Sequence, residues 1–130
     1  MPEMRDPTYY TLAVLLEGRT HGYAILERVR EMTSGRVRLT AGTLYGVLDR
    51  LVDEGLAERA GSEIVRGRAR QYFEITDTGS GAVQAEADNR AEAAAAVHRL
   101  TRARPAVGNR PRRRVVPGVS FGPLSASWVT

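Results

Sequence analysis

One segment, residues 40–56, constrains the fold of this chain more than any other. Apolar side chains recur in it at the i, i+3, i+4, i+7 spacing that predicts an amphipathic helix, and they are Leu44, Val47, Leu48 and Leu51. Thr40 is a suitable N-cap, because its hydroxyl can accept a hydrogen bond from a free backbone N–H of the first turn. Gly55 suits the left-handed residue that ends a helix. We therefore expect a helix over about 41–54.

The segments around this helix indicate the rest of the domain. Residues 56–60 and 71–75 are strand candidates, and the second is rich in aromatic and β-branched residues. A basic loop is expected between them, over 61–70. Upstream, a helix over about 22–32 precedes the connection, in which we expect a short strand at 37–39. Helix, strand, basic loop and strand in this order are typical of a winged-helix domain.

Two further helices flank this unit. The first is expected over about 8–17, and its buried side chains are predicted to be Leu12, Leu15 and Leu16. Thr76 is expected to cap a long helix over 77–100, in which Gly79 and Gly81 should weaken the first turns. A loose a/d spacing runs along the long helix, formed by Val83, Ala87, Arg90 or Ala91, Ala94 and Val97. This apolar stripe is small and narrow, so pairing of two helices through it alone would be weak.

The last segment, 101–130, differs from the rest in composition and charge. It holds four of the six prolines, and this composition predicts disorder. Residues 1–100 carry thirteen arginines and fifteen acidic residues, a net charge of −2, whereas the tail carries six arginines and no acid, a net charge of +6. The overall charge of +4 is therefore no evidence that the folded domain binds nucleic acid. The tail arginines at 110 and 112–114 suggest a DNA-binding arm, but a solvated, non-functional extension is the favoured interpretation.

Several classes of function have little support. The chain has no cysteine, which excludes a disulfide framework, a thiolate nucleophile and a cysteine-based metal site. Its two histidines have no carboxylate at ligand spacing beside them. No G-x-S-x-G motif, phosphate-binding loop or acid–base pair is found. We expect no enzyme activity, no metal and no cofactor. The N-terminus has no secretory apolar region and no apolar run is long enough to cross a membrane, so we expect a cytoplasmic protein.

The chain resembles the PadR family of bacterial transcriptional regulators from about residue 8 to about residue 100. The resemblance is carried by His21-Gly22-Tyr23, Gly42-Thr43-Leu44-Tyr45, Leu48 to Leu51, Glu54-Gly55-Leu56, Arg70-Gln71-Tyr72 and Ile75-Thr76-Asp77-Thr78-Gly79. Together, in this order and spacing, these motifs are fairly specific. The resemblance implies a winged-helix repressor that dimerises through its C-terminal helix and binds a two-fold symmetric operator in double-stranded DNA.

The helix over 41–54 is then the expected recognition helix. Thr43 and Tyr45 offer hydroxyl groups to phosphates or base edges, and Arg50 suits a phosphate. The alternative for Tyr45 is burial against the helix that precedes it. Asp49 lies near the outward face, where its carboxylate could accept a hydrogen bond from a cytosine amino group. The favoured alternative is that it turns away, or pairs with Arg50 or with the surroundings of Asp53.

The expected wing and the start of the second helix supply the other candidate contacts. Arg66, Arg68 and Arg70 alternate, so an extended wing would point all three to one side, over phosphates or into a minor groove. The alternative is a set of solvated charges. His21 and Tyr23 stand where the second helix begins, and a helix N-terminus can bind a phosphate.

The sequence thus predicts a mainly α fold with a small β-wing: a winged-helix domain over 8–76, a dimerisation helix over 77–100 and the basic tail. The candidate dimer interface consists of Tyr9, Leu12, Leu16, Val83, Ala87, Ala94, Val97 and Leu100. The predicted function is that of a homodimeric repressor. The alternatives are a winged helix used for contact with another protein, and an inactive regulator with an aberrant C-terminus. Any small-molecule effector is unidentified.

Overall fold

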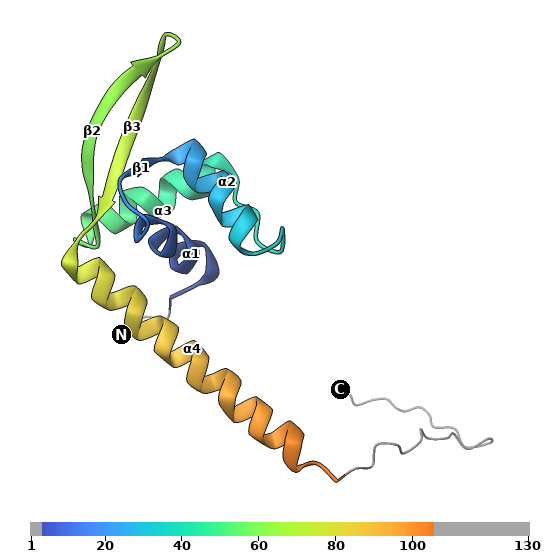
Figure 1. Ribbon diagram of the computed structural model, residues 1–130. Helices are drawn as coiled ribbons and strands as arrows, with labels where there is room; N and C mark the ends of the chain where they lie inside the picture. Colours follow the sequence, from blue (N-terminus) through green and yellow to red (C-terminus); the bar gives the residue numbers. More distant parts are fainter. Residues whose placement is uncertain (1–3, 106–130) are drawn as a thin grey trace, which may run out of the picture. The chain divides into compact units, whose positions relative to one another are not determined.

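The computed structural model describes residues 4–105. The chain divides into two units, Met1–Ala91 and Glu92–Thr130, and the last helix passes from the first unit into the second. The elements in chain order are α1 (Asp6–Leu15), β1 (Thr20–His21), α2 (Gly22–Met32), α3 (Ala41–Asp53), β2 (Ala57–Val65), β3 (Arg68–Ile75) and α4 (Asp77–Ala103) (Figure 1). This order confirms the predicted winged-helix architecture.

The ends of α3 form as the sequence predicts. The Thr40 hydroxyl accepts a hydrogen bond from the backbone N–H of Thr43, at 3.1 Å. Gly55 follows the helix with a φ of +77°, a left-handed conformation that a residue with a side chain rarely adopts. The predicted stripe of four apolar residues is buried. Local capping and periodicity therefore account for this helix.

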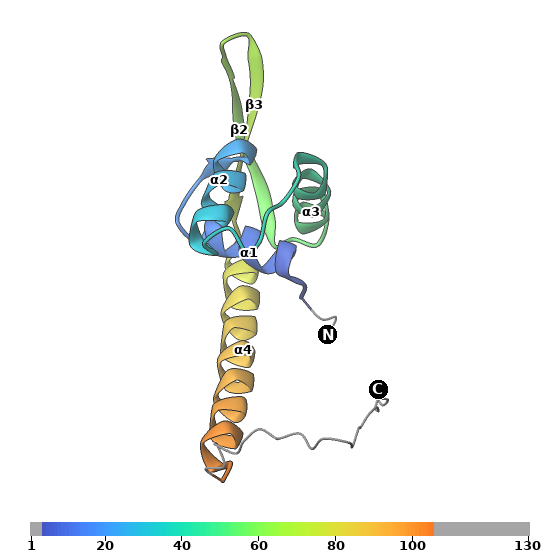
Figure 2. The same ribbon diagram turned by 90° about the vertical axis from the view of Figure 1, so that its right-hand side faces the viewer.

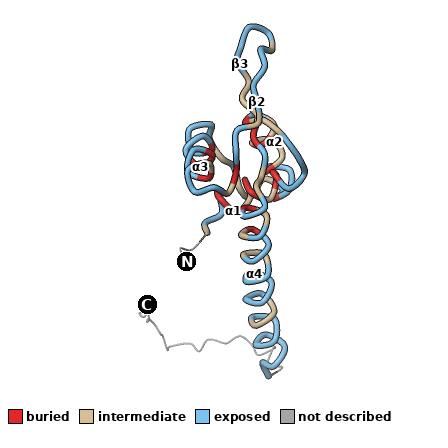
Figure 3. The backbone as a smooth tube through the Cα atoms, turned by 90° about the vertical axis from the view of Figure 1, so that its left-hand side faces the viewer, coloured by how far each residue is buried: buried red, intermediate tan, exposed pale blue. Residues whose placement is uncertain are grey.

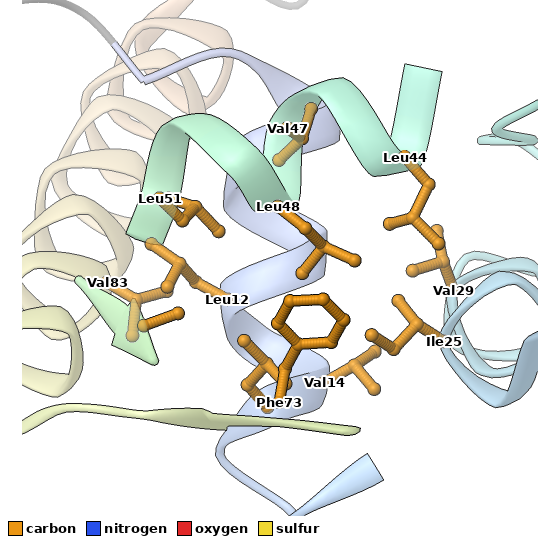
Figure 4. Close-up of a cluster of buried hydrophobic side chains, with 12 residues drawn as sticks. Leu12, Val14, Ile25, Val29, Leu44, Val47, Leu48, Leu51, Phe73 and Val83 are labelled. Carbon is orange, nitrogen blue, oxygen red and sulfur yellow. The ribbon is translucent and has the colours of Figure 1, made fainter. Parts of the chain in front are cut away.

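One hydrophobic core joins the elements of the first unit. Figure 3 shows that buried residues gather where α1, α2 and α3 meet and near the base of the β2–β3 hairpin, whereas the far end of the hairpin is exposed. In Figure 4, Phe73 of β3 points toward Leu48 of α3, and Val83 of α4 closes one side of the cluster. Leu12 and Leu15 are buried as predicted, but the prediction for Leu16 is wrong. Leu16 lies just after α1, and 52% of it is exposed.

The wing is longer and more regular than the sequence suggests. β2 and β3 pair antiparallel from Ala57 opposite Ile75 to Val65 opposite Arg68. Only Arg66 and Gly67 remain in the connection, with φ values of +54° and +77°. Two residues with positive φ match the hairpin turn whose twist suits paired strands. The prediction of a loop over the whole of 61–70 is therefore wrong, because most of that segment is strand.

The third strand of the sheet is not where the sequence placed it. The strand order is β1-β3-β2, with Thr20 opposite Phe73 and His21 opposite Tyr72. The predicted strand at 37–39 is absent from the described part of the chain. The Thr33 hydroxyl instead accepts the backbone N–H of Val37, at 3.0 Å. A buried side chain thus satisfies a donor that a strand partner would have taken.

Helix α4 begins and ends close to its predicted bounds. The Thr76 hydroxyl caps it by accepting the backbone N–H of Gly79, at 3.0 Å. The helix continues to Ala103, a little past the predicted end at Leu100. The remainder of the predicted basic tail, 106–130, lies outside the described residues. Within residues 4–105, no helix is both long enough and apolar enough to span a bilayer.

Arg90 fastens α4 to the start of the chain. Its guanidinium contacts the Asp6 carboxylate at 3.0 Å, the Glu86 carboxylate at 2.9 Å and the Met4 carbonyl at 3.1 Å, and it lies 3.8 Å from the centre of the Tyr9 ring. Burial disfavours the charged form of Arg90, but the hydrogen bonds to Glu86 and Asp6 outweigh this and raise its pKa. The sequence offered Arg90 or Ala91 as a stripe position, and Arg90 is engaged within its own chain.

Candidate nucleic-acid interface

A groove of about 690 Å³ lies where the start of α2, the N-terminal half of α3 and the wing come together. Most of the residues predicted to contact DNA line it, together with Gly22, and they are His21, Tyr23, Tyr45, Arg66, Arg68 and Arg70. No carboxylate is among the lining residues. Folding therefore brings together cations and hydroxyl groups that are far apart in the sequence.

Tyr45 packs against α2 and also lines the groove, so the structure combines features of the two alternatives that the sequence left open. Its ring rests on Gly22 so closely that a methyl group added at Gly22 would overlap the Tyr45 hydroxyl and lie 2.7 Å from Cζ. The side chain nevertheless keeps 44% of its surface exposed and lines the groove. Packing against α2 thus orients Tyr45 without burying it, and its contact with DNA stays a prediction.

His21 caps α2 rather than leaving the helix start open. Its Nδ1 atom accepts the backbone N–H of Ala24 at 3.3 Å, and its ring meets the Tyr72 ring edge to face, with centroids 5.4 Å apart. An accepting Nδ1 requires that atom to be unprotonated. Burial and then the positive charge of Arg70 lower the pKa of His21, and the negative charge of Glu63 opposes them. The neutral imidazole takes up one N–H that we expected to be available to a phosphate.

Two of the three wing arginines lie in β3, and the third lies in the turn. Arg68 and Arg70 lie two residues apart in β3, so their side chains leave the same face of the strand. Arg66 lies in the turn with positive φ, where strand alternation does not apply. Strand alternation therefore accounts for the shared face of Arg68 and Arg70 but does not extend to Arg66. All three nevertheless line the groove.

The opposite flank of α3 holds Arg50 in a smaller groove of about 310 Å³ beside the start of α1. The Arg50 Nη2 atom donates to the Thr8 hydroxyl at 2.9 Å, although the two residues are far apart in the sequence. Thr43 also lines this groove. Its side-chain oxygen lies 3.1 Å from that of Thr40, within the cap of α3. Thr43 and Arg50 therefore do not share the first groove with Tyr45.

Asp49 has a partner that the sequence did not predict. Its carboxylate accepts from the Arg59 guanidinium of β2 at 3.0 Å, rather than pairing near Arg50 or Asp53. Both side chains are largely exposed, so the pair adds little stability. Its electrostatic effect is to offset a negative charge on the outward side of α3. No local signal marks Arg59, because the pairing depends on how β2 folds back along the helix.

Arg19 is a second residue that no sequence pattern marked. Its guanidinium lies 4.0 Å from the centre of the Tyr72 ring, and its Nε atom donates to the Ala60 carbonyl at 2.9 Å. Arg19 therefore braces β2 against β3 at the base of the wing. The chain folds β1 next to β3, and only this arrangement places Arg19 there.

The predicted dimer residues fall into two groups by burial. Leu12 and Val83 are 0% and 3% exposed and belong to the core of their own domain. Leu16, Val97 and Leu100 are 52%, 58% and 72% exposed. Ala87 is half-buried and Ala94 exposed. The dimer interface stays a prediction, and the exposed group suits it better than the buried group.

Comparison with solved structures identifies the fold. A transcriptional regulator from Clostridium thermocellum is 22% identical, with 72% of this chain and 87% of that chain covered, at a TM-score of 0.60. A PadR family regulator from Clostridium difficile is 20% identical, with 73% and 97% covered, at a TM-score of 0.63. Bacillus subtilis PadR, solved in complex with operator DNA, is 18% identical, with 90% and 53% covered, at a TM-score of 0.55. No curated protein matches the chain.

The sequence itself matches a family model. The model of the transcriptional regulator PadR-like family matches residues 11–85, which include α2, α3 and the whole wing. The family consists of transcriptional regulators, which indicates a regulatory rather than a catalytic role. Since the match covers more than half of the chain and the fold agrees with it, the chain belongs to the PadR-like family of transcriptional regulators.

Proposed function

We propose that this protein is a homodimeric transcriptional repressor that binds a two-fold symmetric DNA operator through α3 and the β2–β3 wing. The observation that carries the proposal is the groove of about 690 Å³, in which three wing arginines face Tyr45 and the capped start of α2 with no carboxylate among the lining residues. Such a surface attracts a phosphate backbone, and Bacillus subtilis PadR is a family member solved with operator DNA.

The shape of α3 supports entry into the major groove. Gly42 and Gly46 lie on its exposed side, and a methyl group added at either would meet no other atom within 4 Å. The middle of that side is therefore narrow. A helix of about 10–12 Å in diameter fits a major groove about 12 Å wide, and a narrow outward side lets it approach the base edges closely. Tyr45 and Thr43 then supply hydroxyl groups near the N-terminal end of the helix, where base edges are usually reached.

The dimer part of the proposal is supported by exposed apolar side chains. Val97 and Leu100 lie three residues apart in α4 and share one side of the helix. They are 58% and 72% exposed in the single chain. A second copy packed on them would remove that surface from water, and two copies would present two recognition helices to a symmetric operator.

The test is a footprint on the promoter beside the protein's own gene. We expect two protected half-sites about one helical turn apart, roughly 34 Å, and higher transcription from that promoter when the protein is absent. Changing Arg66 and Arg68 to Ala should weaken binding to any duplex and reduce the salt slope by about 0.9 for each phosphate that is no longer neutralised. Arg28→Ala with Arg30→Ala is the charge-matched control, since these residues pair with Glu17 and Glu27 outside the groove. Absence of salt-dependent duplex binding by the wild-type protein would refute the proposal.

A further inference from the structure

The smaller groove on the second flank of α3 is a candidate site of its own. Its volume is about 310 Å³, and it is bounded by Arg5, Pro7 and Thr8 of the chain start and by Gly42, Gly46 and Arg50 of α3. α3 stands out to one side of the domain in Figure 2, and the first turn of α1 approaches it from below, on the side away from the wing tip. The two grooves therefore flank the same helix.

The charges at this groove are unbalanced. Arg5 and Arg50 both line it, and no carboxylate does. Within residues 4–105, neither arginine takes part in an ion pair. The nearest acid in the sequence, Asp6, is bound by Arg90 at 3.0 Å. Two positive charges therefore face solvent in one concave surface, and an anion would complete it.

The groove also holds one of its cations in place. Thr8 is 9% exposed, and its hydroxyl accepts from Arg50 Nη2 at 2.9 Å. A guanidinium has five N–H donors, so this single bond orients Arg50 and leaves the others for a ligand. The neutral Thr8 hydroxyl fixes the Arg50 side chain and leaves its positive charge in place, whereas a carboxylate would cancel that charge. Gly42 and Gly46 add no side chain that would cover the groove.

The position of the groove identifies the anion. Tyr45 and Arg50 are five positions apart, which is a rotation of about 140° around the helix axis. A helix seated in the major groove has one phosphate backbone on each side. If the Tyr45 flank with the wing faces one strand, the Arg50 flank faces the other. Continuity with the candidate DNA interface therefore favours a phosphate of duplex DNA over a small metabolite.

We infer that Arg5, Arg50 and Thr8 form a second phosphate-binding site, which holds the operator strand opposite to the one held by the wing. This inference rests on the proposed function and extends it: α3 is gripped from both flanks. Arg5 and Arg50 bind the phosphate, and Thr8 is a positioning residue that acts through Arg50.

Phosphate ethylation interference on the operator tests this with the full-length protein. We expect two groups of interfering phosphates in each half-site, on opposite strands. Arg5→Ala with Arg50→Ala should abolish one group and leave the other, whereas Arg66→Ala with Arg68→Ala should do the reverse. Because the proposed dimer holds two copies of each site, each pair of substitutions should also reduce the salt slope by about 1.8, at about 0.9 for one phosphate in each subunit. Arg28→Ala with Arg30→Ala should change neither group.

Three further variants separate a binding role from a structural one. Arg5 is exposed and makes no side-chain cap bond, so Arg5→Ala alone should keep the melting temperature and still produce about half of the effect on the salt slope. Thr8→Ser should keep the interference pattern, and Thr8→Val should weaken the interference that depends on Arg50. Wild-type binding that depends on the wing but not on Arg5 or Arg50 would overturn this inference and leave the proposed function standing. No binding by the wild type would overturn both.

Discussion

Two glycines separated by one residue in α4 should respond to the same substitution with opposite signs. Gly79 is buried in the first turn of α4. A methyl group added there would overlap the Leu56 carbonyl oxygen and lie 2.9 Å from Ile75 Cγ1. Gly81 is exposed, and a methyl group added there would meet no other atom within 4 Å. The sequence alone gives both glycines the same helix-weakening role.

The magnitudes follow from packing and helix propensity. Replacing an exposed helical glycine by alanine stabilises a helix by about 1 kcal/mol, so Gly81→Ala should gain about that much. Gly79→Ala has the same gain in helix propensity, but it also forces a methyl group against the Leu56 backbone, which cannot rotate away. Overpacking of that kind costs about 3 kcal/mol at the upper end of its usual range. The net expectation for Gly79→Ala is a loss of about 2 kcal/mol, or roughly 8–16 °C in melting temperature.

Thermal and urea unfolding followed by circular dichroism, at one protein concentration, measures both variants. The decisive quantity is the difference in sign between them, since Gly81→Ala controls for helix propensity and for the unfolded chain. Stabilisation by Gly79→Ala equal to that by Gly81→Ala would show that α4 does not pack closely against Leu56, and the reasoning would fail.

Three other predictions concern single side chains. The buried Thr11 hydroxyl has no hydrogen-bond partner among the described residues, so Thr11→Val should leave stability unchanged or raise it by about 1 kcal/mol. Thr33→Val is its control: it should lower stability by about 1–3 kcal/mol in urea unfolding, because the Thr33 hydroxyl binds Val29 and Val37. Equal effects of Thr11→Val and Thr33→Val on stability would contradict this difference in hydrogen bonding. Burial and the charge of Arg70 lower the pKa of His21 from the ordinary value of 6.5. As the pH falls, the unfolded chain therefore takes up the proton on His21 before the folded chain does. The stabilising contribution of His21 is therefore complete above about pH 6.5 and is lost as the pH falls through the lowered folded pKa. His21→Asn keeps a capping oxygen but does not titrate, so its unfolding free energy should depend less on pH than that of the wild type, and parallel curves would contradict the assignment. Val97→Glu should shift sedimentation toward monomer and raise the dissociation constant of the dimer about tenfold or more, since a charge would be buried at the seam. Arg99→Glu, on another side of α4, should leave the dissociation constant of the dimer unchanged. A dimer that is unaffected by Val97→Glu would place the interface elsewhere.

The local features of this protein were predictable because their causes lie within a few residues. The cap of α3 by Thr40, the left-handed Gly55 and the buried stripe each depend on neighbours no more than about one or two helical turns away. The same is true of the Thr76 cap of α4. Such signals can be recognised along the chain. Together with the motif order, they were sufficient for the winged-helix architecture and the family.

The tertiary structure decided the pairings between distant residues. Asp49 met Arg59 rather than a neighbour on its own helix, and Arg50 met Thr8 across the domain. The third strand formed at Thr20–His21, where it could pair with β3, and not at 37–39. Much of β2 and β3 was predicted as loop, because a solvent-exposed hairpin needs no apolar alternation to form once its strands are paired. Hydrogen bonds across a sheet and between helices depend on register and crossing geometry, which no short segment contains. For that reason α3 could be predicted from its residues, whereas the two basic grooves beside it could be found only in the folded chain.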